Sequence, residues 1–501
     1  MRLLASVALA ALVAGCTSSQ VDDGPSAASF PALAGADRCA AVAPAMLGAT
    51  TATGKWVEEA NGLPGFCEVT ATLSPASGSN IGVVYRLPAS WNGKVLGFGG
   101  GGWIGNIALQ TASEGLRKGY ATLQTDGGHP VGNVWDNSWA ANPEQAKDFS
   151  YRAIHEMTVA GKKLVAAYYD QPHRRAYYQG CSTGGRMGLM EAQRYPDDYD
   201  LISAGAPVYT LQTQTSAVLR GQTFARPGAS FTAADLQLAQ TAALDACDAD
   251  DGIKDGLVND PRQCRWDPAT IQCTGAKTDS CLSAPQVTAL RAAYEGVRAP
   301  DGEWAMLPMS RGGEAGWAAF VGTSGAPDAT NGGGLGGLWP IIFGNRPVDL
   351  PGMTLEDVQT VRRSGFAEIY EADDPDLRPF FRSGGKLLLW HGESDPGPSP
   401  VATNDYWRAV QAQAPAARSQ ARYFLLPGTG HCGGGPGASR VAWLDVLENW
   451  DETGRAPEVV HGGGPASLVR PHCAWPNVAR YRGSGDANDP ANWQCVRRAS
   501  S

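Results

Sequence analysis

The sequence has little charge, and neither sign is concentrated. Only 18% of its 501 residues are Asp, Glu, Lys or Arg, and 49 acidic against 40 basic residues give a net charge of −9. Proteins that bind nucleic acid carry basic patches or runs of Lys and Arg, and this chain has no such run. We therefore expect no nucleic-acid partner.

Long apolar segments are also scarce. The clearest one, residues 3–13, follows Arg2 and is too short to span a bilayer, but it has the length of the apolar part of a secretory signal. We predict a signal peptide at residues 1–15. No other segment is apolar enough to cross a membrane.

The signal ends in V-A-G-C, residues 13–16, which resembles the lipobox of bacterial lipoproteins. On this interpretation Cys16 is lipidated, residues 16–36 form a tether, and the membrane is contacted only through the lipid. The residue after this cysteine is Thr17 rather than Asp, which resembles the pattern of Gram-negative lipoproteins that are sorted to the outer membrane. We expect a periplasmic or outer-membrane lipoprotein, or an extracellular protein; cleavage nearby, with Cys16 left as a spare thiol, is the alternative.

Pairs of the C-x-x-C type, internal repeats and low-complexity tracts are all missing. The first absence argues against a zinc site. The other two indicate that the 63 glycines and 34 prolines belong to a loop-rich globular protein. Of 11 cysteines, a lipidated Cys16 leaves ten, an even number that suits disulfides in an oxidising compartment. Spacing alone does not choose the pairs.

The most informative motif present is G-C-S-T-G at residues 180–184. The residues before it, 175–179, predict a buried strand, and residues 185–195 predict a helix. G-x-S-x-G between a strand and a helix is typical of a nucleophile elbow, a strained turn that exposes the serine hydroxyl. We therefore predict Ser182 as a catalytic nucleophile.

A serine nucleophile needs an imidazole base, and the imidazole needs a carboxylate to orient it. The candidates are His431, in a glycine-rich loop, and Asp395, which follows the apolar run at residues 386–392. The chain order Ser, Asp, His is that of α/β-hydrolases. A structural histidine in a glycine-rich loop is the alternative, but Cys181 and Cys432 stand beside the proposed pair.

Four glycines at residues 99–102 follow a predicted strand at residues 94–98. Acyl transfer creates a negatively charged oxygen, which two backbone N–H groups must face. We predict the N–H of Thr183 and that of Gly101 or Gly102 as this oxyanion hole. A phosphate-binding loop is the rival interpretation, but no lysine follows at the required spacing.

Predicted strands and helices alternate along the chain, which indicates an α/β fold with a mostly parallel sheet. After Pro207 this pattern stops, and it resumes near Gly384. The gap of about 175 residues is too long for a loop. We therefore predict a catalytic domain of residues 37–207 and 384–501 with an inserted lid at residues 208–383. The further predicted elements are strands at 81–87, 120–125 and 201–207 and a helix at 148–169.

Together the motifs resemble the tannase/feruloyl esterase family of α/β-hydrolases, which have a Cys-Ser, Asp, His-Cys arrangement and include polyester-monomer esterases of the MHETase type. The similarity covers residues 39–495 and includes W-H-G-E-S-D-P at residues 390–396. It implies a doubly wound sheet with a large lid. It also implies five disulfides, Cys39–Cys67, Cys181–Cys432, Cys247–Cys264, Cys273–Cys281 and Cys473–Cys495.

Residues 248–260, D-A-D-D-G-I-K-D-G-L-V-N-D, place carboxylates and glycines as a hard, oxygen-liganded cation requires. The glutamate of an EF-hand is missing, and an acidic solvated turn is the alternative. The resemblance implies a structural calcium site. Its ligands would be the side chains of Asp248, Asp251 and Asp255 and the carbonyl groups of Ile253 and Leu257.

Trp339, Phe343 and Arg346 of the lid are candidate substrate contacts, because rings stack on an aromatic acid and a guanidinium pairs with a carboxylate. A role in the core of the lid is the alternative. Polyester-monomer esterases carry an acidic residue after the nucleophile, whereas this chain has Thr183, as feruloyl esterases and tannases commonly do. The remaining histidines are expected to be structural, and His391 to pack near Asp395.

We predict a secreted serine carboxylic-ester hydrolase that cleaves small aromatic esters of the feruloyl or galloyl type through an acyl-enzyme. The alternatives are an aromatic monoester hydrolase of the polyester-monomer type, an acyltransferase on the same fold, and a non-catalytic surface lipoprotein. Nothing in the sequence selects an oligomeric state.

Overall fold

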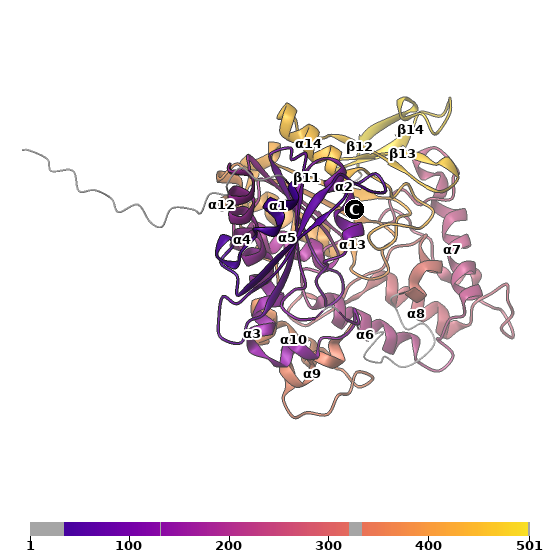
Figure 1. Ribbon diagram of the computed structural model, residues 1–501. Coiled ribbons are helices and arrows are strands. Elements are labelled where there is room, and N and C mark those ends of the chain that lie inside the picture. Colours follow the sequence, from indigo (N-terminus) through magenta and orange to yellow (C-terminus); the bar gives the residue numbers. More distant parts are fainter. Residues whose placement is uncertain (1–34, 131, 320–332, 499–501) are drawn as a thin grey trace, which may run out of the picture.

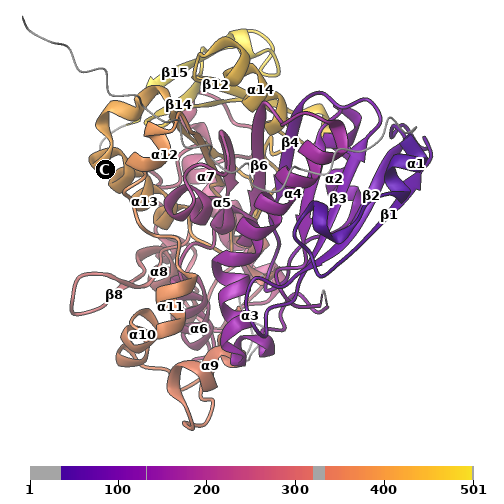
Figure 2. The same cartoon turned by 60° about the vertical axis from the view of Figure 1, so that its left-hand side comes forward.

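The computed structural model describes residues 35–130, 132–319 and 333–498. The predicted signal peptide, Cys16 and nearly all of the tether lie outside these ranges. Within them, a twisted central sheet carries helices on both faces, with a mostly helical segment on one side and short strands at the top of the view in Figure 1 and Figure 2.

The central sheet has nine strands. In spatial order they are Thr51–Val57 (β1), Phe66–Leu73 (β2), Ile81–Pro88 (β3), Ala121–Thr125 (β5), Lys94–Phe98 (β4), Arg175–Cys181 (β6), Leu201–Gly205 (β7), Lys386–Gly392 (β10) and Ala421–Leu426 (β11). Pairing is antiparallel from β1 through β3 to β5, and parallel from β5 to β11. This is the mixed, mostly parallel sheet of an α/β-hydrolase.

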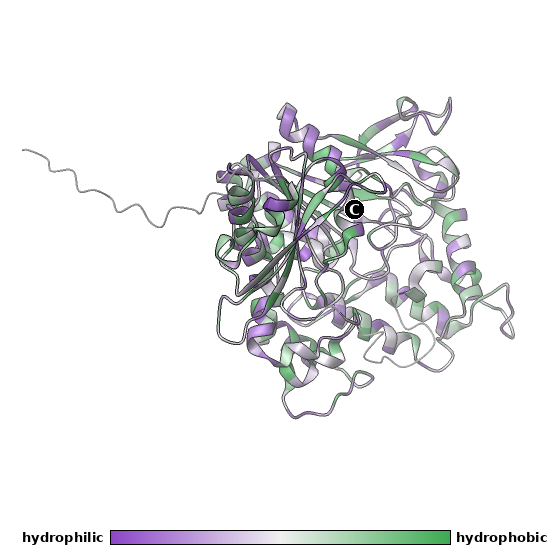
Figure 3. Cartoon of the chain, viewed as in Figure 1, coloured by the Kyte–Doolittle hydropathy of each residue, from purple (hydrophilic) through white to green (hydrophobic). Residues whose placement is uncertain are grey.

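Side chains of the parallel strands alternate between two hydrophobic cores, one on each face of the sheet. Tyr178 and Leu389 point into the first core, whereas Tyr177 and Leu388 point into the second. Strands covered on both faces must be apolar throughout, and Figure 3 shows hydrophobic residues along them. The helices of the first core are Ala153–Tyr169 (α4), Thr183–Arg194 (α5) and Pro400–Gln413 (α13), and those of the second are Leu109–Arg117 (α2) and Trp443–Thr453 (α14).

In the described residues between β7 and β10, the regular structure is mainly helical. Two short strands there, Val297–Arg298 (β8) and Trp304–Met306 (β9), pair with each other. The first part of this segment has a hydrophobic core of its own, from Phe224 to Trp317. Side chains of the second part, including Trp339 and Tyr370, join the first core of the sheet. Its helices are Gln212–Phe224 (α6), Ala233–Cys247 (α7), Ala284–Glu295 (α8), Leu335–Phe343 (α9), Leu355–Arg362 (α10), Gly365–Tyr370 (α11) and Arg378–Arg382 (α12).

The chain ends in two antiparallel pairs, Val459–Gly463 (β12) with Val469–Cys473 (β13), and Asn477–Tyr481 (β14) with Trp493–Arg497 (β15). All five disulfides implied by the family resemblance are present. Such a number is typical of a protein from an oxidising compartment. Among the helices in the described ranges, none combines the length and the apolar character needed to cross a bilayer.

Candidate active site

Ser182 lies in the turn between β6 and α5, at the carboxyl end of a central parallel strand. Its backbone has φ 63° and ψ −125°, a conformation that non-glycine residues rarely adopt. The turn closes tightly, because a Cβ atom on Gly180 would lie 2.3 Å from the carbonyl oxygen of Gly184. The predicted elbow therefore has the strained geometry that directs a serine away from the strand.

A continuous line of hydrogen bonds joins the three predicted catalytic side chains. The Nε2 atom of His431 lies 2.8 Å from the Oγ atom of Ser182, and its Nδ1 atom lies 2.7 Å from the Oδ2 atom of Asp395. His431 is in the loop after β11, and Asp395 in the loop after β10. Three loops at one edge of the sheet thus bring together residues that are up to 249 positions apart.

Asp395 is ionised although its side chain is fully buried. Burial raises its pKa, but the charge and hydrogen bond of His431, together with those of His391, outweigh it and lower the pKa to about 2. The Oδ1 atom also accepts a hydrogen bond from the N–H of Gly397 at 2.8 Å. The carboxylate is therefore able to fix the orientation of the His431 ring at any pH above its own pKa.

A disulfide lies directly beside the line of hydrogen bonds. It joins Cys181, the last residue of β6, to Cys432, with Cα atoms 5.9 Å apart. Each cysteine is the chain neighbour of a proposed catalytic residue, Ser182 or His431. The bond therefore ties the serine turn to the histidine loop.

The two glycines predicted for the oxyanion hole differ in what their N–H groups do. The N–H of Gly101 donates to the carbonyl oxygen of Ile104 at 3.1 Å. In the described part of the chain, no acceptor lies against the N–H of Gly102. Thr183 is the first residue of α5, where the N–H has no partner within the helix. Among the described residues, the N–H groups of Gly102 and Thr183 are thus available to a substrate oxygen. The Thr183 hydroxyl donates to the Gly102 carbonyl at 2.5 Å.

Arg186 holds the amino end of α5 in place, a role that the sequence analysis did not identify. Its buried guanidinium donates to the carbonyl oxygens of Ser150, Tyr370 and Phe149 at 2.6, 3.0 and 3.0 Å. It also lies over the Tyr370 ring, 4.3 Å from the centroid. Burial lowers its pKa. The helix that carries Ser182 is thereby fastened to the segment after β7.

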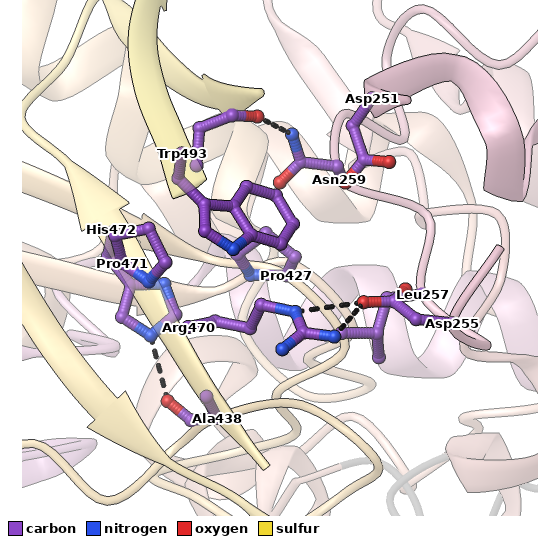
Figure 4. Close-up of a pocket in the computed structure, with 11 residues that line it drawn as sticks. Asp251, Asp255, Leu257, Asn259, Pro427, Ala438, Arg470, Pro471, His472 and Trp493 are labelled. Atoms are coloured by element: carbon purple, nitrogen blue, oxygen red, sulfur yellow. Dashed lines mark hydrogen bonds and ion pairs between the residues drawn. The ribbon is translucent and has the colours of Figure 1, made fainter. Parts of the chain in front are cut away.

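The acidic loop at residues 248–260 packs against the C-terminal strands, around a small pocket shown in Figure 4. The carboxylate of Asp248 accepts backbone hydrogen bonds from Asp255, Gly256 and Leu257 at 3.0, 2.9 and 3.3 Å. This arrangement curls the loop around one side chain. Cys247–Cys264 closes the same loop.

Two further carboxylates of this loop face the pocket. Asp255 receives two hydrogen bonds from Arg470 on its Oδ2 atom, at 2.9 and 2.6 Å, while its Oδ1 atom is buried without a partner in the described residues. Burial raises the pKa of Asp251 to about 7 and also raises that of Asp255. A buried carboxylate oxygen without a partner, beside a second carboxylate that faces the same pocket, suits a cation bound by oxygen ligands.

The predicted substrate contacts have structural partners. Trp339 has no exposed surface, and Phe343 packs against it with ring centroids 4.3 Å apart. Arg346 lies over both rings and forms two hydrogen bonds with Asp357. These contacts account for all three side chains, so a role for them in substrate binding stays a prediction. Phe320, a further aromatic residue of the predicted lid, lies outside the described residues.

A second group of polar side chains, not identified from the sequence, lies between α4 and α5. The Nδ1 atom of His155 is 2.6 Å from Asp198, and Glu191 is near both. Burial, followed by the nearby Asp198 carboxylate, raises the pKa of Glu191 well above its usual value. Both carboxylate oxygens of Glu191 are buried without a hydrogen-bond partner among the described residues. Glu191 lies about two and a half helical turns beyond Ser182 on α5.

The sequence matches the family described as tannase and feruloyl esterase over residues 67–326 and 343–496. A mono(2-hydroxyethyl) terephthalate hydrolase from Piscinibacter sakaiensis is 35% identical over 515 residues, which cover 87% of this chain and 85% of that protein. Feruloyl esterase B from Aspergillus niger is 31% identical over 86% of each chain.

Solved structures agree with this relationship. The crystal structure of feruloyl esterase B from Aspergillus oryzae superposes with a TM-score of 0.83 and 27% identity, over 92% of this chain and 100% of that one. A tannin acyl hydrolase from Aspergillus niger superposes with a TM-score of 0.74 and 23% identity, which supports the fold alone.

Proposed function

The chain belongs to the tannase and feruloyl esterase family of carboxylic-ester hydrolases, and we propose that it cleaves esters of aromatic acids through an acyl-enzyme on Ser182. The observation that carries this proposal is the line of hydrogen bonds from the Ser182 hydroxyl through His431 to Asp395. A strained turn and a buried carboxylate are what this reaction requires of a serine and its base.

In the first half-reaction, Ser182 Oγ attacks the carbonyl carbon of the ester while the Nε2 atom of His431 takes the hydroxyl proton. The bond to the alcohol oxygen then breaks, and His431 gives its proton to the departing alcohol. In the second half-reaction, water gives a proton to His431 and attacks the carbonyl carbon of the acyl-enzyme. The bond to Ser182 Oγ then breaks, His431 returns the proton to Oγ, and the acid is released. Asp395 keeps the His431 ring in the required orientation throughout.

The negative oxygen of each tetrahedral intermediate would be held by the N–H groups of Thr183 and Gly102. Donors of this kind act most strongly when they are fixed before the reaction begins. The helix start fixes Thr183, and the hydrogen bond from its hydroxyl to the Gly102 carbonyl fixes the second donor relative to the first. Gly101 is less suited, since its N–H already donates to Ile104.

We place ferulate-like or gallate-like esters ahead of terephthalate monoesters as substrates. The relatives named above act on esters of ferulate and terephthalate, which are both aromatic acids. A terephthalate monoester carries a second carboxylate, and a cationic side chain that contacts the substrate would have to pair with it. Arg346, the candidate for that contact, is already paired with Asp357. The monoester activity remains the second candidate, because the relative from Piscinibacter is 35% identical.

The test is a hydrolysis panel of methyl ferulate, methyl gallate, chlorogenate and a terephthalate monoester, with and without added ethanol. We expect turnover of at least one of the first three, with free acid rather than the ethyl ester as the main product. Ser182→Ala should abolish turnover and labelling by a fluorophosphonate, whereas Ser113→Ala on α2 should change neither. Activity and labelling that survive in Ser182→Ala would exclude Ser182 as the nucleophile.

We also propose that the acidic loop binds calcium as a structural ion. Asp248, Asp251 and Asp255 would supply carboxylate oxygens, and Ile253 and Leu257 backbone carbonyl oxygens. The unpartnered Oδ1 atom of Asp255 supports this assignment. When bound, the ion would neutralise the buried carboxylates and hold the loop against the C-terminal strands; it has no part in the chemical steps.

The protein is proposed to act outside the cytoplasm. Five disulfides support an oxidising compartment. Export would follow from the signal at residues 1–15, with a lipid on Cys16 as the anchor. Mass spectrometry of the N-terminal peptide tests this directly, since a diacylglyceryl group on Cys16 supports the anchor and an unmodified Cys16 or a mature N-terminus beyond it excludes it.

A further inference from the structure

Asp395 has two histidine partners rather than one. Its Oδ2 atom lies 2.7 Å from the Nδ1 atom of His431 and 3.1 Å from the Nε2 atom of His391. His391 is next to the last residue of β10, and its side chain has no exposed surface. It therefore approaches the carboxylate from inside the protein, where neither substrate nor bulk water reaches it.

The surroundings of His391 determine which ring nitrogen carries hydrogen. The Nε2 atom lies within hydrogen-bond distance of the Asp395 carboxylate and of the Pro398 carbonyl oxygen, at 3.1 and 3.2 Å. Both are acceptors only, so Nε2 must be the donor. The Nδ1 atom lies 2.8 Å from the Oγ1 atom of Thr403 on α13. In a neutral ring Nδ1 is an acceptor, and the Thr403 hydroxyl donates to it.

We propose that His391 is a positioning residue for the ester hydrolysis assigned above, and that the Thr403 hydroxyl, by donating to Nδ1, holds its ring in place. This inference rests on the proposed function of Ser182, His431 and Asp395. Through its Nε2–H group, His391 holds the Asp395 carboxylate in the plane in which Oδ2 accepts the Nδ1–H of His431. The same hydrogen bond withdraws part of the carboxylate charge that faces the His431 ring.

The charged groups around this carboxylate are few. Apart from the two histidines, Arg220 of α6 is fully buried nearby and donates to the carbonyl oxygens of Ser216 and Pro396 at 3.1 and 3.5 Å. Burial lowers the pKa of Arg220 to about 10, against the attraction of Asp395, so it stays protonated at neutral pH. The N–H of Gly397 donates to the Oδ1 atom of Asp395. Among these contacts, His391 is the only side chain besides His431 that is bonded to Oδ2.

The test compares His391→Leu, which removes the donor, with His391→Gln, whose amide nitrogen takes the place of Nε2. With p-nitrophenyl acetate as substrate, His391→Leu should lower kcat by about tenfold to a hundredfold, because a displacement of about 1 Å between catalytic groups has an effect of this order. KM should change less than about twofold, and the acid limb of kcat/KM should move to higher pH. His391→Gln should restore most of the rate and the original limb.

Thr403→Val provides a second route if His391→Leu does not fold, and it should lower kcat by a few-fold because the His391 ring loses the hydrogen bond to its Nδ1 atom. His155→Leu is the matched control, since it removes a histidine bonded to another carboxylate, Asp198, and should leave kcat unchanged. Wild-type kcat and pH profile in folded His391→Leu, or equal losses in the Gln and Leu variants, would overturn the proposal. Undiminished turnover in Ser182→Ala would instead refute the proposed function itself.

Discussion

The hydroxyl group of Thr183 donates a hydrogen bond to the carbonyl oxygen of Gly102 at 2.5 Å. One of these residues follows the nucleophile and the other belongs to the glycine tract after β4, so the bond spans the two halves of the proposed oxyanion hole. It sets the distance between their N–H groups.

Thr183→Val should therefore lower kcat about tenfold with little change in KM, because the side chain keeps its shape but releases the Gly102 loop. Complete loss of one oxyanion donor costs on the order of a hundredfold to a thousandfold, and misplacing one should cost less. Thr183→Ser, which keeps the hydroxyl, should stay near the wild-type rate. Steady-state kinetics on methyl ferulate or a nitrophenyl ester decides the matter, and equal rates in the Val and Ser variants would show that the bond is dispensable.

Loss of the Cys181–Cys432 disulfide should damage catalysis more than folding. The bond lies beside Ser182 and His431, so its removal lets the two loops separate, and about 1 Å of separation is worth on the order of a hundredfold in rate. The chain-entropy estimate for its long loop is roughly 5 kcal/mol of stability, an upper figure. The measurement is kcat of Cys181→Ala/Cys432→Ala at a temperature where circular dichroism shows the folded state.

The matched control is Cys273→Ala/Cys281→Ala, which removes a disulfide that closes a short loop far along the chain from the proposed catalytic residues. We expect this variant to keep its kcat. If the Cys181/Cys432 double variant is fully active while folded, the bond is only a structural cross-link.

Chelation should lower the melting temperature without abolishing the activity of the folded protein. Calcium at a free concentration of about 100 times its dissociation constant stabilises the native state by about 2.7 kcal/mol. For a chain of this length, that corresponds to a rise of roughly 3 °C in the melting temperature. Differential scanning fluorimetry with EDTA and with added calcium measures the shift. Asp255→Asn should abolish it, whereas Asp250→Asn, an exposed neighbour in the same loop, should not. No bound calcium and no shift would exclude the site.

Asp126→Asn should stabilise the protein increasingly as the pH rises. Burial raises the pKa of Asp126 to about 7, against hydrogen bonds from the N–H groups of Gly128 and Gly82. Since the unfolded value is about 4, the folded state holds a proton that the unfolded state lacks between these pH values. The free energy of unfolding therefore falls as the pH rises from about 4 through 7.

The asparagine is neutral at every pH, and its Oδ1 atom still accepts both N–H groups. Melting temperatures between pH 4.5 and 8.5 should show a gain over wild type that is smallest at the acid end and complete above about pH 8. Asp136→Asn is the control, and it should lower the melting temperature rather than raise it as the pH rises. Backbone and side-chain hydrogen bonds from Ser138 lower the pKa of Asp136, so its ionised form stabilises the folded state. A gain for Asp126→Asn that does not vary with pH would contradict the assignment.

Much of the hydrolase core was predictable because its strands are covered on both faces. The apolar runs at residues 94–98 and 386–392 coincide with β4 and β10. The strand predicted at residues 175–179 lies within β6, which continues to Cys181. The sequence did not predict the antiparallel strand β1. Its residues alternate between exposed and partly exposed, and they include Gly54 and Lys55, which are not typical of strands. A strand at the edge of the sheet has no continuous apolar signal.

The residues of the candidate site also fall into those that the sequence predicts and those that it does not. Ser182, Asp395 and His431 could be proposed because each stands in a short, local sequence motif. The contacts of Thr183 with Gly102, of His391 with Asp395 and of Arg186 with backbone carbonyls depend on how distant loops meet, and residue order alone does not reveal them. Arg346 shows the reverse case. Its guanidinium group suggested a contact with a substrate carboxylate, whereas in the structure it pairs with Asp357, only 11 positions away.

The disulfide from Cys181 to Cys432 also has a topological consequence. The whole helical segment between β7 and β10 lies inside the ring of chain that this bond closes. A protease that cuts once within that segment therefore separates the chain into two pieces that remain covalently joined. The nicked protein should therefore keep its full mass on a gel without reductant, and Ser182 and His431 would stay on covalently joined pieces.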